Sequence, residues 1–134
     1  MYNENMPKVN ISIGELLDKM SILEIKLKKV NDVSKLKNIN KEYETLKSVS
    51  KTIESINPTE FADLYAELLV VNNKLWEIED NIRIFEKEKK FDQNFIEIAR
   101  DVYINNDYRF AIKTKINRVF NSDIVEEKDY EDYS

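Results

Sequence analysis

Apolar residues recur along this chain at alternating intervals of three and four positions. In the first run these residues are Ile13, Leu16, Met20, Leu23, Leu27 and Val30. This spacing places the apolar side chains on one face of an α-helix, in a seam typical of a coiled coil. Ser12 and Glu15 can form a capping box at the start of the run, and Asn31 and Asp32 interrupt it. The pattern therefore predicts a helix that begins after Ser12 and ends at Val30.

The same spacing predicts two further long helices. The second run extends from about Val33 to Ile56. Asn57 and Pro58 then provide a cap and a tolerated first residue for a third helix, whose apolar spacing continues to Phe85. Roughly 30 residues at 1.5 Å each make this third helix about 45 Å long. The short break between the first two helices favours an antiparallel hairpin.

Two shorter helices are predicted for the C-terminal part of the chain. Asp92 is a suitable cap for a fourth helix, and Asp107 is a suitable cap for a fifth that ends near Asn121. Asn105 and Asn106, together with Asp107, are typical of a turn between these two helices. The apolar residues expected to face inward are Phe95, Ile98, Ala99, Val102, Tyr108, Ala111, Ile112, Ile116, Val119 and Phe120.

The scarcity of turn residues supports a purely helical architecture. One Gly and two Pro in 134 residues are too few for the turns of a β-sheet fold. We therefore expect an all-α fold, a long antiparallel helical hairpin or bundle with a third long helix and two shorter C-terminal helices. Residues 1–128 are expected to form a single helical domain, and residues 129–134 an acidic, flexible tail. Long seams with few aromatic residues often bury a remaining face by pairing, so a homodimer is also expected.

The composition excludes most of the common enzyme sites. The chain has no Cys and no His, which removes thiol nucleophiles, disulfides, zinc knuckles and the Ser-His-Asp triad. Its single Gly is too few for a phosphate-binding loop of the Walker or Rossmann kind. With no usable pair of nucleophile and base, a non-enzymatic role is favoured.

The distribution of charge and hydropathy limits the partners and the location. The net charge is -5, and residues 122–134 carry all of this excess, with one Lys against six acids. A near-neutral body with an acidic tail makes nucleic acid an unfavourable partner. No stretch approaches the ~20 apolar residues of a membrane span, and Met1 to Asn10 do not resemble a signal peptide. Without Cys, a cytoplasmic location is expected.

Three clusters of charged residues on or beside the apolar stripes are candidate binding sites, because charge is costly there unless it is paired. The first is Glu24 with its neighbour Lys26 on the first predicted helix. Glu24 follows Leu17 and Met20 at helical spacing, on a row of residues beside the apolar seam, so this carboxylate is expected to face inward. Its simplest interpretation is an ion pair with a neighbouring Lys or Arg in the bundle.

The second cluster lies on one shoulder of the third predicted helix. Trp76 and Asp80 are four residues apart, as are Glu79 and Arg83, so an indole, two carboxylates and a guanidinium share that shoulder. One interpretation is an ion pair beside a core tryptophan. The other is a binding site for an anionic group, a metal or a partner.

The third cluster belongs to the last two predicted helices. It comprises Arg100, Tyr103, Asp107, Arg109 and Lys113. Arg109, Lys113 and Asn117 share one face at intervals of four residues, and residues 108–121 hold four positive charges and no acid. Such a basic face could bind a phosphate, or it could hold the acidic segment that follows.

Two functional hypotheses follow from these clusters. The leading one is a binding or scaffold module without a cofactor, whose partner is a protein or a small anionic ligand. The alternative is a Mg²⁺-dependent hydrolase similar to the all-helical nucleotide pyrophosphohydrolases. Its candidate metal ligands are two carboxylate pairs, each three residues apart, Glu15 with Asp18 and Glu77 with Asp80.

Several motifs also resemble a known family. They are S-I-G-E-L-L-D-K at residues 12–19, I-L-E-I-K at residues 22–26 and L-W-E-I-E-D at residues 75–80. The chain resembles a small uncharacterised helical family of bacteria and phages that carries a domain-of-unknown-function label. The resemblance covers nearly the whole chain, so it implies one coherent domain that includes Glu126, Glu127 and Lys128. It implies no catalytic residue.

Overall fold

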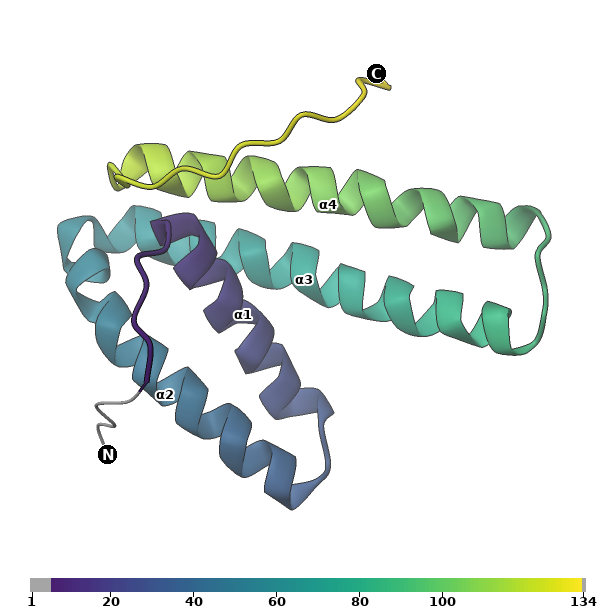
Figure 1. Cartoon of the computed structure of the whole chain (residues 1–134), viewed down its shortest axis with the longest axis horizontal. Helices are drawn as coiled ribbons and strands as arrows, with labels where there is room; N and C mark the ends of the chain where they lie inside the picture. Colours follow the sequence, from purple (N-terminus) through teal and green to yellow (C-terminus); the bar gives the residue numbers. More distant parts are fainter. Residues whose placement is uncertain (1–5, 134) are drawn as a thin grey trace.

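A computed structural model of the protein describes residues 6–133, most of which are helical. These residues form four α-helices and no strand (Figure 1). The helices are α1 (Ile13–Lys29), α2 (Val33–Ile56), α3 (Pro58–Lys87) and α4 (Gln93–Val119). The expected all-α fold and its long third helix are therefore confirmed. Within residues 6–133, no helix is both long enough and apolar enough to cross a membrane.

Polar N-cap residues explain where each helix begins. In every case a side-chain oxygen accepts a hydrogen bond from the backbone amide three residues later, which satisfies one of the free donors of the first turn. The contacts join Ser12 to Glu15 (3.1 Å), Asp32 to Lys35 (3.0 Å), Asn57 to Glu60 (3.2 Å) and Asp92 to Phe95 (3.2 Å). Pro58 occupies the first turn of α3, where its missing N–H is tolerated.

The helices pair as two hairpins that cross each other. α3 and α4 run side by side in opposite directions, and their connected end extends well beyond the other pair (Figure 1). α1 packs against both α3 and α4, whereas α2 packs mainly against α1. α2 is correspondingly poorly covered, because Ser50 is its one buried residue and the apolar residues Val49 and Ile56 are 56% and 63% exposed.

The predicted turn at residues 105–107 is wrong, because α4 continues through it as one helix of 27 residues. Asn105 is buried, and its side-chain Nδ2 donates to the Asp101 carbonyl at 2.8 Å. The amide group is thus satisfied inside the helix and does not redirect the chain. Because the helix is not interrupted, the side of α4 that faces inward in its first half also faces inward in its second half. Three residues predicted to face inward, Tyr108, Ala111 and Val119, are consequently exposed.

The apolar core lies where α1, α3 and the end of α4 converge. Its members are Leu17, Phe61, Leu64, Leu68, Ile116 and Phe120, each at most 7% exposed. Burying a side chain of this size contributes about 1.5–3 kcal/mol. The core therefore fixes the first half of α1 against the second half of α4, which is the contact that builds the polar cluster described below.

After α4 the chain runs back along that helix in an extended conformation (Figure 1). Glu126 forms an ion pair with Lys113 at 2.7 Å, and the Lys128 ammonium lies 4.9 Å from the centre of the Phe110 ring. Further on, the Tyr133 hydroxyl donates to the Asp107 carboxylate. The segment after α4 thus lies against the face of α4 that carries Lys113.

Candidate functional site

The first turn of α1 touches α4 at the only glycine of the chain. A Cβ on Gly14 would lie 2.6 Å from the Lys113 carbonyl oxygen, so only glycine allows the two backbones to approach this closely. The Gly14 amide donates to Asn117 Oδ1 at 2.7 Å, and the Ile13 amide donates to Ser122 Oγ at 3.1 Å. Two amides that a helix start leaves free are therefore satisfied by residues of and just beyond α4.

This approach places Asp18, one turn further along α1, directly against α4. Asp18 is fully buried, and Arg109 Nε donates to its Oδ1 and Oδ2 at 2.9 and 3.0 Å. Arg109 Nη2 donates to Oδ2 as well, and Asn72 Nδ2 donates to Oδ1 at 2.9 Å. The hydrogen bonds to Asp18 raise the pKa of Arg109 above its ordinary value. A buried carboxylate is thus bound by a guanidinium in bidentate geometry.

Lys113 extends the same cluster toward the C-terminal segment. Its side chain is 8% exposed, and its Nζ lies 2.9 Å from Glu15 Oε2 and 2.7 Å from Glu126 Oε2. Burial lowers the pKa of Lys113, but the hydrogen bonds with Glu126 and Glu15 outweigh that effect and the pKa is raised overall. We call these residues the Asp18 network, which consists of Glu15, Asp18, Asn72, Arg109, Lys113 and Glu126.

A hollow of about 340 Å³ opens beside the Asp18 network, between α1, α3 and α4. Its lining residues are Ile22, Asn72, Leu75, Trp76, Glu79, Asp80, Arg83, Asn106 and Arg109. We call it the Trp76 hollow. Arg109 therefore belongs both to the Asp18 network and to the lining of the hollow. Arg83 and Glu79 form an exposed ion pair of 3.4 Å at the same place.

A comparison with known protein families identifies the chain. The model of a family of unknown function, DUF6165, matches residues 7–133. The chain belongs to this family. Among curated proteins and solved structures, no match to the DUF6165 chain was found. The family match agrees with the expectation of an uncharacterised domain that spans nearly the whole chain.

The structure brings together one part of the predicted binding residues of this DUF6165 chain. All four residues of the predicted shoulder of α3 line the Trp76 hollow, and Arg109 of α4 lines it with them. Trp76 is half-buried there, so its indole is neither fully in the core nor free on the surface. Lys113 is not among the residues that line the hollow and belongs to the Asp18 network, where its Nζ lies 3.8 Å from Asp18 Oδ2.

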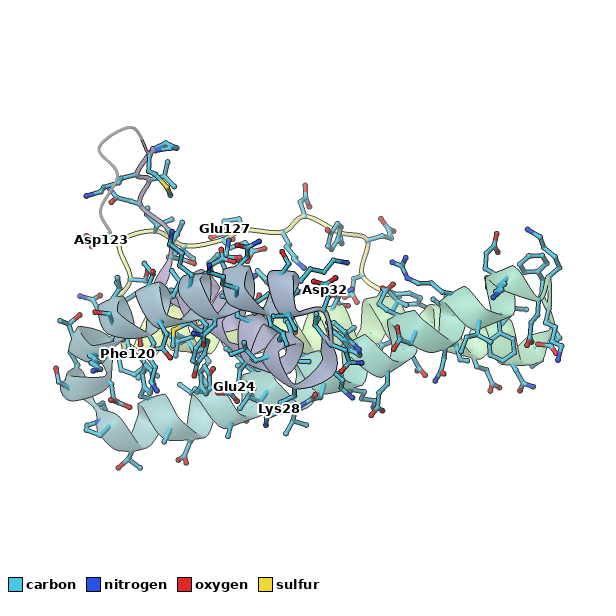
Figure 2. The ribbon with its side chains drawn as sticks, turned by 90° about the horizontal axis from the view of Figure 1, so that it is seen from below. Glu24, Lys28, Asp32, Phe120, Asp123 and Glu127 are labelled. Atoms are coloured by element: carbon cyan, nitrogen blue, oxygen red, sulfur yellow. The ribbon has the colours of Figure 1, made fainter. Side chains whose placement is uncertain are left out.

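Glu24 lies away from the Trp76 hollow. The prediction that it pairs with a Lys or Arg is wrong, because its partners are two tyrosines. Its Oε1 accepts from the hydroxyls of Tyr43 at 3.2 Å and Tyr65 at 3.4 Å. Burial, followed by the charge of Glu24, raises the pKa of both tyrosines. Figure 2 shows Glu24 on a different side of the molecule from the C-terminal segment, which carries Glu127. Lys26 is half-buried on the same helix as Glu24.

A third location holds Arg100, Tyr103 and Asp107. Arg100 Nε donates to the Tyr103 hydroxyl at 3.4 Å, and the rings of Tyr103 and Tyr133 meet edge to face at 5.2 Å. The hydrogen bond to Asp107 raises the pKa of Tyr133 to about 12. Tyr103 and Asp107 thus contact Tyr133 near the end of the C-terminal segment, so the third predicted cluster is divided between this location and the Asp18 network.

The four carboxylates of the metal alternative are not arranged as one donor set. Asp18 is bound by Arg109, Glu15 is paired with Lys113, and Glu77 and Asp80 are exposed on α3. Over residues 6–133, no group of three or more acidic side chains is placed so that it could hold a metal ion.

Sequence reasoning missed the role of Asp18 and of Asn72. Asp18 was expected only as a metal ligand, and Asn72 was not expected in a site at all. The signal that could have found this contact is Gly14, because a single glycine in the first turn of a helix indicates a close approach of another backbone. That approach, together with the core contacts of Leu17 and Ile116, brings the face of α1 that carries Asp18 against the cations of α4.

Proposed function

We propose that this DUF6165 protein is a non-enzymatic binding module, and that the Trp76 hollow is its binding site. The observation that carries the proposal is the double role of Arg109, whose guanidinium is held by the buried carboxylate of Asp18 and which also lines the hollow. A guanidinium has three nitrogens, and the hydrogen bonds to Asp18 use Nε and Nη2. The arrangement orients a cationic group beside an open cavity.

The energetics of the Asp18 network support a functional role. A buried ion pair is often no more stable than well-packed apolar residues of the same volume, because removing two charges from water is costly. Stability alone therefore gives a helical bundle little reason to bury Asp18 and Lys113, with the half-buried Arg109 beside them. A network that fixes the guanidinium for recognition provides such a reason.

The charges around the hollow indicate the chemistry of the partner. Arg83 and Arg109 contribute two positive charges, and Glu79 and Asp80 contribute two negative charges. This balance favours a partner with charges of both signs over a polyanion. Trp76 adds an apolar, aromatic surface between them. We infer that the partner is a polypeptide segment that presents an apolar side chain flanked by an acidic and a basic one.

The ion pair between Arg83 and Glu79 can open, so that each residue pairs with a charged group of the partner instead. Arg83 and Glu79 are 3.4 Å apart, and their side chains are 77% and 46% exposed. Exposed pairs of this kind contribute about 0–1 kcal/mol, so replacing one partner by another costs little. Both groups are thus free to turn toward a bound segment.

The single tryptophan of the chain provides a direct readout of this site. A library of short random peptides is selected against the full chain, and the enriched peptides are synthesised and titrated while the fluorescence of Trp76 is followed. We expect saturable changes, and we expect the enriched sequences to place an apolar residue between opposite charges. The E79A/R83A variant should bind these peptides about tenfold or more weakly.

A matched control separates the site from general surface charge. Lys19 and Glu42 form another exposed ion pair of 3.4 Å, between α1 and α2. The K19A/E42A variant should therefore bind the selected peptides as the wild type does. Equal binding by E79A/R83A and the wild type, or peptides that leave the Trp76 emission unchanged, would contradict the proposal.

A further inference from the structure

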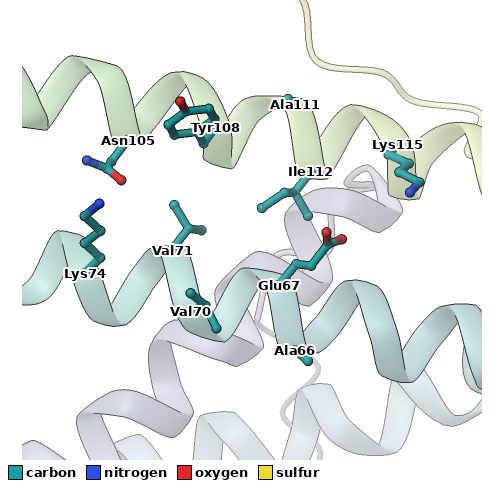
Figure 3. Close-up of a pocket in the computed structure, with 10 residues that line it drawn as sticks. All are labelled: Ala66, Glu67, Val70, Val71, Lys74, Asn105, Tyr108, Ala111, Ile112 and Lys115. Atoms are coloured by element: carbon teal, nitrogen blue, oxygen red, sulfur yellow. The ribbon is translucent and has the colours of Figure 1, made fainter.

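A second cavity lies on the opposite face of the α3–α4 hairpin. In Figure 1 α1 crosses in front of this hairpin, and in the view of Figure 3 it passes behind, so the groove between α3 and α4 opens away from α1. Its volume is about 630 Å³. The lining residues are Ala66, Glu67, Val70, Val71, Lys74, Asn105, Tyr108, Ala111, Ile112 and Lys115.

The groove exposes apolar side chains along both of its walls. Val70 on α3 is 71% exposed and Tyr108 on α4 is 62% exposed, and Ala111 is exposed beside Tyr108. Exposed apolar side chains that face one another across a groove make it a candidate surface for association. The apolar centre has a charged residue of α3 at each end, Glu67 and Lys74.

We propose that the occupant of this groove is a second copy of the chain, so that the α3–α4 faces of two protomers pack antiparallel about a twofold axis. The argument is the placement of charge along α3. Glu67 lies three residues before Val70, and Lys74 lies three residues after Val71. A twofold axis that passes between Val70 and Val71 brings Glu67 opposite Lys74 of the second copy, and Lys74 opposite its Glu67. One surface therefore complements itself in charge.

The other wall agrees with the same arrangement. Tyr108 and Ala111 are three residues apart on α4, so an antiparallel copy places the large side chain of one protomer opposite the small side chain of the other. The apolar residues of both walls are then covered by their equivalents. Burial of exposed apolar area is the term that drives association, and the reciprocal charges fix the register.

This interface is independent of the proposed binding site. The Trp76 hollow is lined by Ile22 of α1, whereas the groove opens on the face of the hairpin away from α1. A dimer through the groove therefore leaves both hollows accessible, one on each outer face. The assembly would present two identical sites to a partner, which raises avidity for a partner with repeated segments.

Sedimentation equilibrium of the full chain across micromolar concentrations tests the proposal. We expect a reversible dimer for the wild type. In an isologous pair each substitution occurs twice, so Glu67→Lys and Lys74→Glu should each raise the dimer dissociation constant about tenfold or more by placing like charges opposite each other. The double variant E67K/K74E exchanges the two charges and should restore dimerisation close to the wild-type level.

Two further variants complete the test. Val70→Glu, at the centre of the groove, should be monomeric at concentrations where the wild type is a dimer. Glu86→Lys makes the same charge reversal at an exposed position near the end of α3 and should leave the dissociation constant unchanged. Thermal melting of each variant confirms that it is folded. A monomeric wild type, or a double variant as weak as the single ones, would overturn the proposal.

Discussion

Two carboxylates of α1 show how the opposing helix decides what an acidic residue does. Asp18 is fully buried against α4 and is bound by Arg109 in bidentate geometry. Glu24, six residues further along, is half-buried and accepts from two tyrosine hydroxyls, one of α2 and one of α3. The same chemical group is thus part of an ion network at one position and a hydrogen-bond acceptor for neutral donors at the other. Their effects on stability should differ accordingly.

Asp18→Asn should produce the largest loss. The substitution keeps the size of the side chain but removes the charge that compensates Arg109, whereas Lys113 keeps Glu15 and Glu126. Leaving a buried charge without its partner costs about 3–5 kcal/mol. Urea unfolding followed by circular dichroism measures this loss directly. A variant as stable as the wild type would show that the guanidinium does not depend on Asp18.

Gly14→Ala tests the backbone approach that gives Asp18 its partners. Alanine at a helix position normally stabilises a protein relative to glycine, by roughly 0.5–1 kcal/mol. At residue 14 the new Cβ would meet the Lys113 carbonyl oxygen at 2.6 Å, so we expect a loss of about 1–3 kcal/mol instead. The free energy of unfolding of the variant, measured by urea titration, shows whether the close contact or the helix preference of alanine has the larger effect. A gain in stability would mean that α1 and α4 are further apart.

Glu24→Gln is the matched change at the second carboxylate. The amide oxygen of Gln can still accept from Tyr43 and Tyr65, so a net loss of about 1 kcal/mol or less is expected. The same urea titration serves as the measurement. A loss as large as that of Asp18→Asn would remove the contrast between the two acids.

The pH dependence of stability sharpens the comparison at Lys113. Its pKa in the folded protein is raised above the ordinary value of 10.5. A group of this kind contributes stability that is fully present below the unfolded pKa and is lost as the pH rises through the folded pKa. The difference in unfolding free energy between the wild type and Lys113→Gln should therefore be constant below about pH 10 and shrink above it. A difference that does not change with alkaline pH would exclude the ion network as its source.

The smallest effect is expected from divalent metal. A ligand that binds only the folded state raises the melting temperature, but the Asp18 carboxylate is already engaged by Arg109 and Asn72. Millimolar Mg²⁺ should leave the thermal midpoint of the wild type unchanged. A clear upward shift that disappears in the Asp80→Asn variant would support the hydrolase alternative instead.

The helices of this chain could be predicted because their signals are local. The N-caps Ser12, Asn57 and Asp92 act on amides three residues away, and the apolar spacing indicates which side of each helix faces the core. The same local reasoning was wrong at Asn105, where a residue typical of turns is buried in the middle of α4. Its side chain bonds to the preceding helical turn, and no local rule distinguishes this from a break.

The site was harder to predict because its contacts join distant parts of the chain. Asp18 and Arg109 are separated by 91 positions, and neither residue indicates the other in a sequence. The four residues of the predicted shoulder line one hollow because they share a side of a single helix, where Trp76 and Asp80, and likewise Glu79 and Arg83, are four positions apart. The crossing angle of the two hairpins determines which other charged residues lie beside that shoulder. Packing around Gly14 and the core sets this crossing, and a local sequence pattern does not indicate it.

A double-mutant cycle between Asp18 and Arg109 tests the central claim most directly. Unfolding free energies are measured for the wild type, Asp18→Asn, Arg109→Gln and the double variant, and the coupling is the part that is not additive. Each single change leaves one member of the Asp18–Arg109 pair without its partner. We therefore expect the double variant to be at least as stable as the less stable of the two single variants. This corresponds to a coupling free energy of about 2–3 kcal/mol. Additive losses would contradict the claim that Asp18 holds the guanidinium of Arg109 at the edge of the Trp76 hollow.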